Sequence, residues 1–185
     1  KKSAKDIDTL NGNGVYEHLR TFIHVGDHAA QLVEEIILGI RLYQINKPMS
    51  LSYESEDDGR VKNLVVLEDQ DYDGETWEFM LSVTDADSEG NEDEGKALQI
   101  FWNRNPVQGI ALLKPYNINR VNDSGLGDAM FRIDYSSDDP IYDETMTVYA
   151  AGFPMPNPLE NPYAIKALKM SAGKKGDIVD VYGNS

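Results

Sequence analysis

The 185-residue chain contains no cysteine, only three histidines and no long apolar run. Without cysteine it can form no disulfide, no thiolate metal site and no cysteine nucleophile. No apolar stretch approaches the roughly 20 residues that a transmembrane helix needs, so we predict no transmembrane span. These absences remove several classes of protein, but they do not fix the compartment in which the chain works.

Basic residues are also scarce. The chain has 17 Lys and Arg against 32 Asp and Glu, which gives a formal net charge of −15. A field of that sign repels phosphate backbones, so we predict that nucleic acid is not a partner. Cations or basic partners fit it better, although a high negative charge also keeps a protein soluble.

Recognisable catalytic motifs are missing as well. No serine lies in a G-x-S-x-G turn, and the chain has no phosphate loop and no G-x-G-x-x-G after an expected strand. Carboxylates are so abundant that no single pair of them indicates a glycosidase. We therefore favour a non-enzymatic role and keep a hydrolase with a site built from loops as an alternative.

What the chain does contain is clear hydrophobic periodicity. Its composition, 41% hydrophobic and 26% charged, is typical of a folded protein. We predict a single domain over residues 1–185, with a polar lead-in at 1–13, a helical segment at 14–46 and an antiparallel β region at 49–185.

The helical segment has one broad apolar face. From Val15 to Tyr43 apolar residues recur at alternating spacings of three and four. Gly26 interrupts this face, and Asp27 could cap a second helix if the chain breaks there. Pro48 ends the pattern, because the residue before a proline disfavours the α conformation.

After the helix the apolar residues change to a period of two, which is typical of strands. The expected strands are 49–54, 60–68, 75–84, 96–103, 107–114, 128–135, 143–151, 163–171 and 177–182. The stretches ALQIFW and GIALLK are continuously apolar, so we expect them to be buried on both faces. Longer connectors are expected at 115–127 and 152–162, the second an extended proline-rich loop.

These elements predict a mainly β fold with an N-terminal helix. Consecutive short strands with tight turns favour an antiparallel meander that curls into a barrel or a strongly bent sheet. The helix would pack on this sheet or inside it, and a two-sheet sandwich is the alternative fold.

The sharpest local motif is DQDYDG. Asp69, Asp71 and Asp73 occupy the first, third and fifth positions of a calcium loop, and Gly74 occupies the sixth. The twelfth position, where a glutamate closes the shell, falls on Met80, and strands rather than helices flank the loop. The motif therefore predicts either a weak calcium site or, more simply, the acidic tip of a β-hairpin.

Two neighbouring acidic turns have nearly the same form and end in Gly59 and Gly90. Successive turns of a meander alternate between its two ends, so we expect Gly59 and Gly90 to share one end and Gly74 to lie at the other.

His24 and His28 have the i, i+4 spacing of a zinc pair, but Val25 replaces the glutamate of H-E-x-x-H. A polar helix face is the simpler interpretation.

Aromatic residues lie mostly on the expected strands. They are Trp77, Phe79, Phe101, Trp102, Tyr116, Phe131, Tyr135 and Tyr149. If the sheet closes, alternate ones would line an interior that is either packed or occupied by a ligand. The loop residues Phe153, Met155 and Tyr163 could instead form a recognition surface.

The segment ALQIFWNRNPVQGIALLKPYNINR, residues 97–120, resembles uncharacterised exported lipoproteins of Bacteroidetes-type bacteria. The acidic hairpins before it and the helix at 15–45 agree with this resemblance. It implies a cell-envelope location, in the periplasm or at the cell surface, and a lipid anchor upstream of the chain. The chain opens without Met, which is consistent with a removed signal segment.

We therefore expect a non-enzymatic cell-envelope module that binds an unknown small ligand or protein partner and needs no cofactor. A calcium-binding β-module built on the loop from Asp69 to Gly74 is the first alternative. A hydrolase with an unrecognised loop-built site is the second.

Overall fold

The computed structural model describes residues 12–88, 90–120, 127–152 and 167–184, with side chains of the first helix described from Gly26 on, except Asp27. The elements are α1 (Gly12–Leu42), β1 (Met49–Glu54), β2 (Val61–Tyr72), β3 (Glu75–Asp85), η1 (Ala86–Ser88), β4 (Lys96–Arg104), β5 (Val107–Leu113), α2 (Pro115–Ile118), β6 (Met130–Ser136), β7 (Glu144–Ala151), β8 (Ala167–Lys175) and β9 (Ile178–Asn184).

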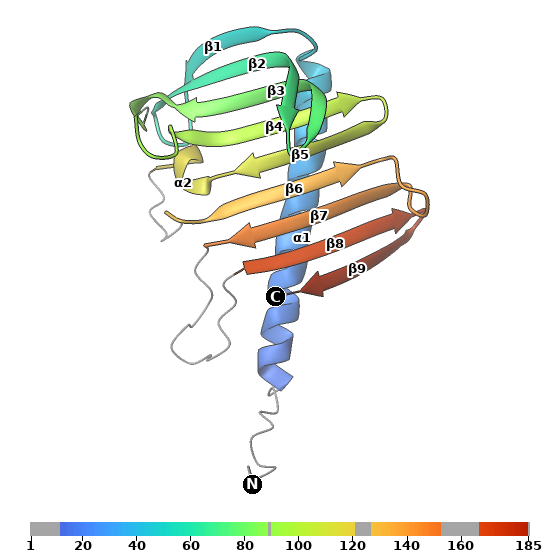
Figure 1. The fold of residues 1–185 in the computed structure, drawn as a ribbon. Coiled ribbons are helices and arrows are strands. Elements are labelled where there is room, and N and C mark those ends of the chain that lie inside the picture. Colours follow the sequence, from blue (N-terminus) through green and yellow to red (C-terminus); the bar gives the residue numbers. More distant parts are fainter. Residues whose placement is uncertain (1–11, 89, 121–126, 153–166, 185) are drawn as a thin grey trace.

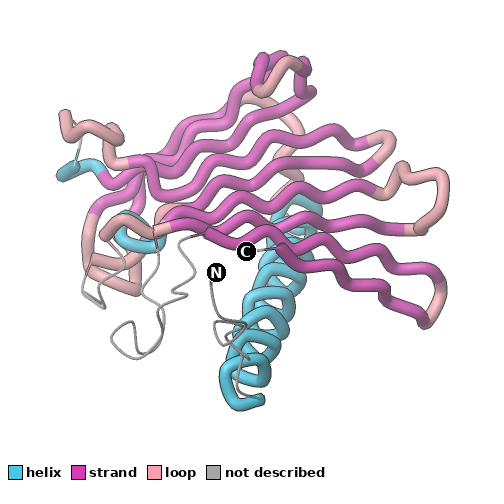
Figure 2. The backbone as a smooth tube through the Cα atoms, turned by 60° about the horizontal axis from the view of Figure 1, so that its bottom comes forward, coloured by secondary structure: helices cyan, strands magenta, loops and turns pink. Residues whose placement is uncertain are grey.

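The nine strands form one antiparallel sheet in which every strand pairs with its neighbours in sequence, in the order β1 to β9. The long helix α1 crosses one face of this sheet at an angle to the strands (Figures 1 and 2).

The predicted mainly β meander with a helix packed on it is confirmed. The closed barrel is wrong, because β1 and β9 do not pair and α1 already covers the apolar face that closure would bury. The two-sheet sandwich is also wrong, since all nine described strands belong to one sheet.

All nine expected strands are present, and the main differences are at their ends. Strand β2 continues to Tyr72 instead of ending at 68, and β8 spans Ala167–Lys175 instead of 163–171. Residues 163–166 of that prediction lie outside the described residues. The connector expected at 115–127 contains the short helix α2.

Helix α1 runs without interruption through Gly26, so the chain does not break there and Asp27 does not cap a second helix. The glycine has a packing role instead. A Cβ atom on Gly26 would lie 2.7 Å from Cε of Met170, so the missing side chain lets α1 approach β8 closely. The predicted apolar face is confirmed for the described residues up to Ile40, whereas Tyr43 lies beyond the end of α1 and is 80% exposed.

The main core lies between α1 and the sheet. Its buried residues are Ala29, Val33, Val66, Phe79, Leu81, Val83, Ala97, Ile100, Trp102, Ala111, Leu113, Ile133, Val148, Ala150, Leu168 and Met170. Among the described residues, no helix has the length and apolar character that crossing a membrane would require.

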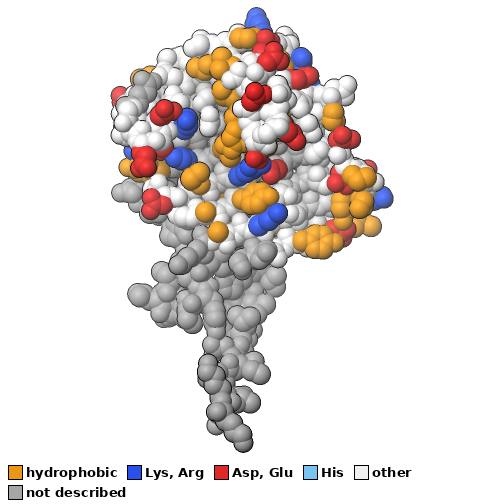
Figure 3. Space-filling model, in the orientation of Figure 1, with side chains coloured by type: hydrophobic (Ala, Val, Ile, Leu, Met, Phe, Trp, Pro, Cys, Tyr) orange, Lys and Arg blue, Asp and Glu red, His pale blue; other side chains and the backbone are white. Residues whose placement is uncertain are grey.

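A second, smaller core cluster of Trp77, Phe101 and Ile110 includes no residue of α1. Phe101 alternates along β4 with Ile100 and Trp102 of the main core, so it points to the opposite face of the sheet. The predicted burial of both faces of β4 and β5 is thus confirmed. Figure 3 views the molecule from the side away from α1, where apolar, acidic and basic side chains are interspersed.

The outer part of the β2–β3 hairpin bends over this second cluster (Figure 1). The ring of Tyr72 stacks on Phe101 with 4.2 Å between ring centroids. At the hairpin tip, Asp73 forms an ion pair of 2.7 Å with Arg132 of β6. These contacts cover the apolar residues that α1 does not reach.

Candidate functional site

A cavity of about 380 Å³ lies between the C-terminal half of α1 and strands β4, β5 and β6. Its apolar walls are formed by Val33, Ile36, Ile37, Ile40 and Ile45 on one side and by Ile100, Trp102, Val107, Ala111 and Ile133 on the other. Small-molecule sites in proteins have volumes of about 300–1,000 Å³ and similarly apolar walls. The cavity therefore has the size and character of a ligand site.

On the sheet side of the cavity, β5 leaves room because it carries two small residues there. Gly109 has no side chain, and Ala111 contributes only a methyl group. A Cβ atom on Gly109 would lie 2.8 Å from the carbonyl oxygen of Phe101, so the close spacing of β4 and β5 favours glycine at this position. Larger residues at these two positions would occupy part of the cavity.

Polar residues surround the apolar walls. They come from the end of α1 and the segment after it (Arg41, Gln44 and Asn46), from the β4–β5 hairpin (Asn103, Arg104 and Gln108) and from β6 (Tyr135). We call these residues the rim. No Asp or Glu is among the described residues that line the cavity.

The two arginines of the rim differ in whether they form an ion pair. Arg104 is already neutralised, since its Nε lies 2.9 Å from Oε2 of Glu78 and its guanidinium lies 4.8 Å from the centre of the Phe79 ring. Arg41 is exposed and makes no ion pair with any described residue. Its charge is therefore available at the rim.

Tyr135 provides a neutral hydroxyl at the same end. Burial raises the pKa of Tyr135 above its ordinary value, as do the charge of Glu144 and the hydrogen bond to it, while the positive charge of Arg41 opposes the rise. The hydroxyl thus stays protonated at neutral pH and donates a hydrogen bond to Glu144. Glu144 is also held by Lys174, with 3.5 Å between Oε2 and Nζ.

Trp102 forms part of the cavity wall and is 6% exposed. Its ring stacks on Phe79, but its buried Nε1–H has no hydrogen-bond partner in the structure described. The other tryptophan differs, because Nε1 of Trp77 donates to the carbonyl oxygen of Tyr72 at 3.1 Å. An unsatisfied buried donor costs about 1–3 kcal/mol.

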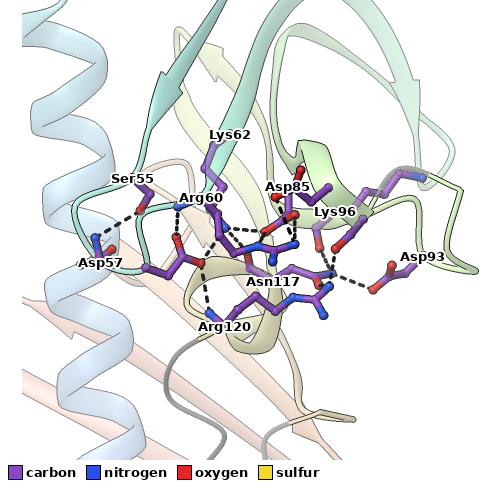
Figure 4. A network of polar contacts seen from close by, with 12 residues as sticks. Ser55, Asp57, Arg60, Lys62, Asp85, Asp93, Lys96, Asn117 and Arg120 are labelled. Carbon is purple, nitrogen blue, oxygen red and sulfur yellow. Dashed lines mark hydrogen bonds and ion pairs between the residues drawn. The ribbon is translucent and has the colours of Figure 1, made fainter.

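A second group of polar residues lies where the β1–β2 turn, the η1 turn and α2 meet (Figure 4). At its centre is Lys62, whose side chain is 2% exposed. Its Nζ donates to Oδ2 of Asp58 at 2.9 Å, to Oδ2 of Asp85 at 2.8 Å and to the carbonyl oxygen of Asn117 at 2.9 Å. An ammonium has three donors, so each donor of Lys62 has an acceptor.

The carboxylates around Lys62 are equally occupied. Arg60 binds Asp85 through two hydrogen bonds, from Nε at 2.6 Å and from Nη2 at 2.8 Å. The hydrogen bonds from Arg60 and then Lys62 outweigh burial and hold the pKa of Asp85 well below its usual range. Burial raises the pKa of Asp58, but hydrogen bonds from the Arg120 backbone N–H, Lys62 and the Arg60 backbone N–H together bring it below its usual value.

We call this group the clamp, because it joins three segments that are distant in sequence. Asn117 extends it by donating to Oδ2 of Asp93 at 2.7 Å and to the carbonyl oxygen of Lys96 at 2.8 Å. Its titratable groups are shifted, as in many active sites. They are engaged with one another, however, and no cavity described here opens onto them, so we interpret the clamp as structural.

The clamp also decides where the acidic turns lie. Asp58, next to Gly59, and Asp85, next to the turn that contains Gly90, share the same lysine, so these two turns lie at one end of the sheet. Gly74 follows the other end of β2. The predicted alternation of the three glycines is confirmed.

The predicted calcium residues lie at and beside the tip of the β2–β3 hairpin. Asp73 and Gly74 form its two-residue turn, with φ values of 55° and 84°, as a type I′ turn requires. The carboxylate of Asp71 accepts a hydrogen bond of 2.6 Å from Thr76, Asp73 is paired with Arg132, and Asp69 is exposed. The hairpin interpretation is confirmed. The described residues contain no group of three or more potential ligands arranged for a metal ion, and calcium binding stays a prediction.

Other predicted site residues are only partly described. His28 is exposed on α1, and the side chain of His24 lies outside the described residues, so a zinc pair stays a prediction. Phe153, Met155 and Tyr163, the proposed recognition loop, also lie outside them.

Sequence reasoning named Trp102 and Tyr135 but missed Arg41 and the rest of the rim. A signal was present. Residues 36–53 and 96–122 contain no Asp or Glu, although the chain has 32. These two acid-free stretches meet at the cavity and supply all its lining residues except Val33, Ile133 and Tyr135.

No protein-family model, no curated protein and no solved structure matches the chain at a significant level. The function is therefore inferred from the residues of the cavity and its rim.

Proposed function

We propose that the protein binds a small, largely apolar molecule in the cavity between α1 and strands β4, β5 and β6. The observation that carries this proposal is an apolar cavity of about 380 Å³ beside the main core. Apolar surface of the ligand would leave water on binding, which contributes roughly 25 cal/mol per Å² removed. The role is that of a binding module, since the clamp residues bind one another and the described rim contains no Ser, Thr, Lys or His.

The cavity is also well placed for selective binding. Its walls belong to a long helix and the middle strands of the sheet, so the site rests on regular elements rather than on loops. A site on such elements keeps its shape with little cost in conformational entropy on binding. The resemblance of residues 97–120 to exported lipoproteins supports a location in the cell envelope, where amphiphilic and apolar molecules are plentiful.

The proposal is tested by filling the cavity. Ile40 lines the cavity, whereas Leu38 is 55% exposed on the same helix. Ile40→Trp adds a bulky ring inside the site, and Leu38→Trp adds the same ring outside it. Binding of decanol and decanoate would be measured by calorimetry below the concentrations at which they self-associate. We expect Ile40→Trp to weaken binding by about tenfold or more, or about 1.4 kcal/mol, and Leu38→Trp to bind as the wild type does.

Circular dichroism and thermal melting show whether both variants fold. If folded Ile40→Trp binds the amphiphile as tightly as the wild type does, the ligand binds elsewhere. If the wild type binds no amphiphile, the proposal is wrong.

A further inference from the structure

Charge is distributed unevenly over this acidic protein. The chain carries a net charge of −15, yet the cavity walls come almost entirely from the two stretches, 36–53 and 96–122, that contain no carboxylate. Elsewhere acidic residues occur in nearly every turn of the described sheet, as in the segments 54–58 and 85–94. A purely apolar ligand would not require its surroundings to be free of negative charge.

The positive charge at the rim comes from Arg41. The other guanidinium of the rim, Arg104, is neutralised by Glu78, whereas Arg41 makes no ion pair with a described residue. Glu144, a carboxylate next to the rim, accepts a hydrogen bond from Tyr135 and forms an ion pair with Lys174. A cation in the last turn of α1 also suits the helix dipole. That effect explains a basic residue at this position but not the missing carboxylates around the cavity.

We propose that the ligand is an anionic amphiphile whose head is bound by Arg41 at the rim and whose apolar body occupies the cavity. This inference rests on the proposed function. A guanidinium presents a planar fork of donors that fits a carboxylate or a phosphate with two parallel hydrogen bonds. Tyr135 and Arg41 both line the cavity, and the charge of Arg41 lowers the pKa of the Tyr135 hydroxyl against the effect of burial.

The test compares amphiphiles that share a ten-carbon chain and differ only in the head. Decanoate and decyl phosphate are anionic, decanol is neutral and decyltrimethylammonium is cationic. The overall charge of −15 would favour the cation. A preference for the anions must therefore come from the site itself.

The matching variants are Arg41→Gln, which removes the charge, Arg41→Lys, which keeps it, and Lys47→Gln, which removes a charge from an exposed residue outside the cavity lining. We expect decanoate to bind roughly fivefold more tightly than decanol, the order of an exposed ion pair. Arg41→Gln should abolish this difference and leave decanol unchanged, whereas Lys47→Gln should preserve it. Arg41→Lys should retain part of it, and added salt should reduce it.

The outcomes distinguish the cavity as the binding site from the preference for an anionic head. Equal affinity for decanol and decanoate, tighter binding of the cation, or an anion preference that survives Arg41→Gln would overturn the anionic head and leave the cavity as the site. Failure of every amphiphile to bind would overturn both proposals. Tighter binding of decyl phosphate than of decanoate would support the inference and identify phosphate as the preferred head.

Discussion

The clamp and the rim use similar residues in opposite ways. In the clamp, each donor of Lys62 has an acceptor, and the carboxylates of Asp58 and Asp85 accept several hydrogen bonds each. At the rim and wall of the cavity, Arg41 has no carboxylate partner among the described residues and the N–H of Trp102 has no acceptor. In the clamp the one buried side-chain group without a partner among the described residues is Nε of Arg120.

The difference indicates what each region is for. Polar groups that are fully paired within the chain stabilise one arrangement of that chain. Unpaired positive charge next to an apolar cavity favours binding of a molecule that supplies the missing partner. This contrast is tested by substituting residues in each region and measuring the free energy of unfolding.

The largest expected effect is on Lys62. Lys62→Met leaves Asp58 and Asp85 buried without the ammonium, and breaking a buried ion pair in this way costs about 3–5 kcal/mol. Lys96→Met is the control, because Lys96 pairs with Glu94 at 2.9 Å on the surface and should remain near wild type. Urea unfolding measures both. Equal stability of the two variants would show that the clamp does not hold the turns together.

The second expected effect is that Asp85 makes the free energy of unfolding fall at acid pH. The pKa of Asp85 is lower in the folded protein than the unfolded value of about 3.9. As the pH falls, the unfolded chain therefore takes up the proton first. The stabilisation is complete above about pH 5 and is lost from about pH 4 downward, through the folded pKa. The free energy of unfolding should thus fall more steeply between about pH 5 and pH 3 in the wild type than in Asp85→Asn. Parallel curves would contradict the role of Asp85.

The two tryptophans give the third test, since they are buried to a similar degree. Trp77→Phe leaves the carbonyl oxygen of Tyr72 without its donor, whereas Trp102→Phe removes a donor that had no acceptor. Both lose similar ring volume. We expect Trp77→Phe to be the more destabilising by about 1 kcal/mol, measured by chemical unfolding. A larger loss in Trp102→Phe would mean that its N–H has a partner in solution.

Calcium should have the smallest effect. The carboxylates of Asp71 and Asp73 already bind Thr76 and Arg132, so a calcium ion would have to compete with these contacts. We expect the melting temperature in a few millimolar calcium to equal that in chelator at fixed ionic strength. A rise of several degrees that disappears in Asp71→Ala would instead establish a calcium site.

The local elements could be predicted because their signals are local. The period of two located all nine strands, and the Asp73-Gly74 pair indicated the hairpin turn that its positive φ values confirm. The apolar stripe located the face of α1 that packs on the sheet. In each case the residues that decide the conformation lie within a few positions of one another.

The clamp and the cavity could not be predicted because their members are distant in sequence. In the stretch VKNLVVL, Lys62 looks like an ordinary exposed strand residue, yet its acceptors Asp85 and Asn117 lie 23 and 55 positions away. The cavity depends on where a straight helix crosses a twisted sheet. Gly26 of α1 lies close to the side chain of Met170 on β8, and no single segment of the sequence reveals that proximity.

The sequential strand order has a consequence for how the protein is made. Each strand pairs with the one synthesised just before it, so the sheet can grow hairpin by hairpin as the chain emerges from the ribosome. The helix is synthesised before any strand, and its apolar stripe packs on strands that follow it, from β4, β5 and β6 at the cavity to β8 at Gly26. The stripe can therefore be covered only in steps as translation proceeds. Until β8 is complete, the part of α1 around Gly26 stays accessible to a chaperone that binds apolar helices.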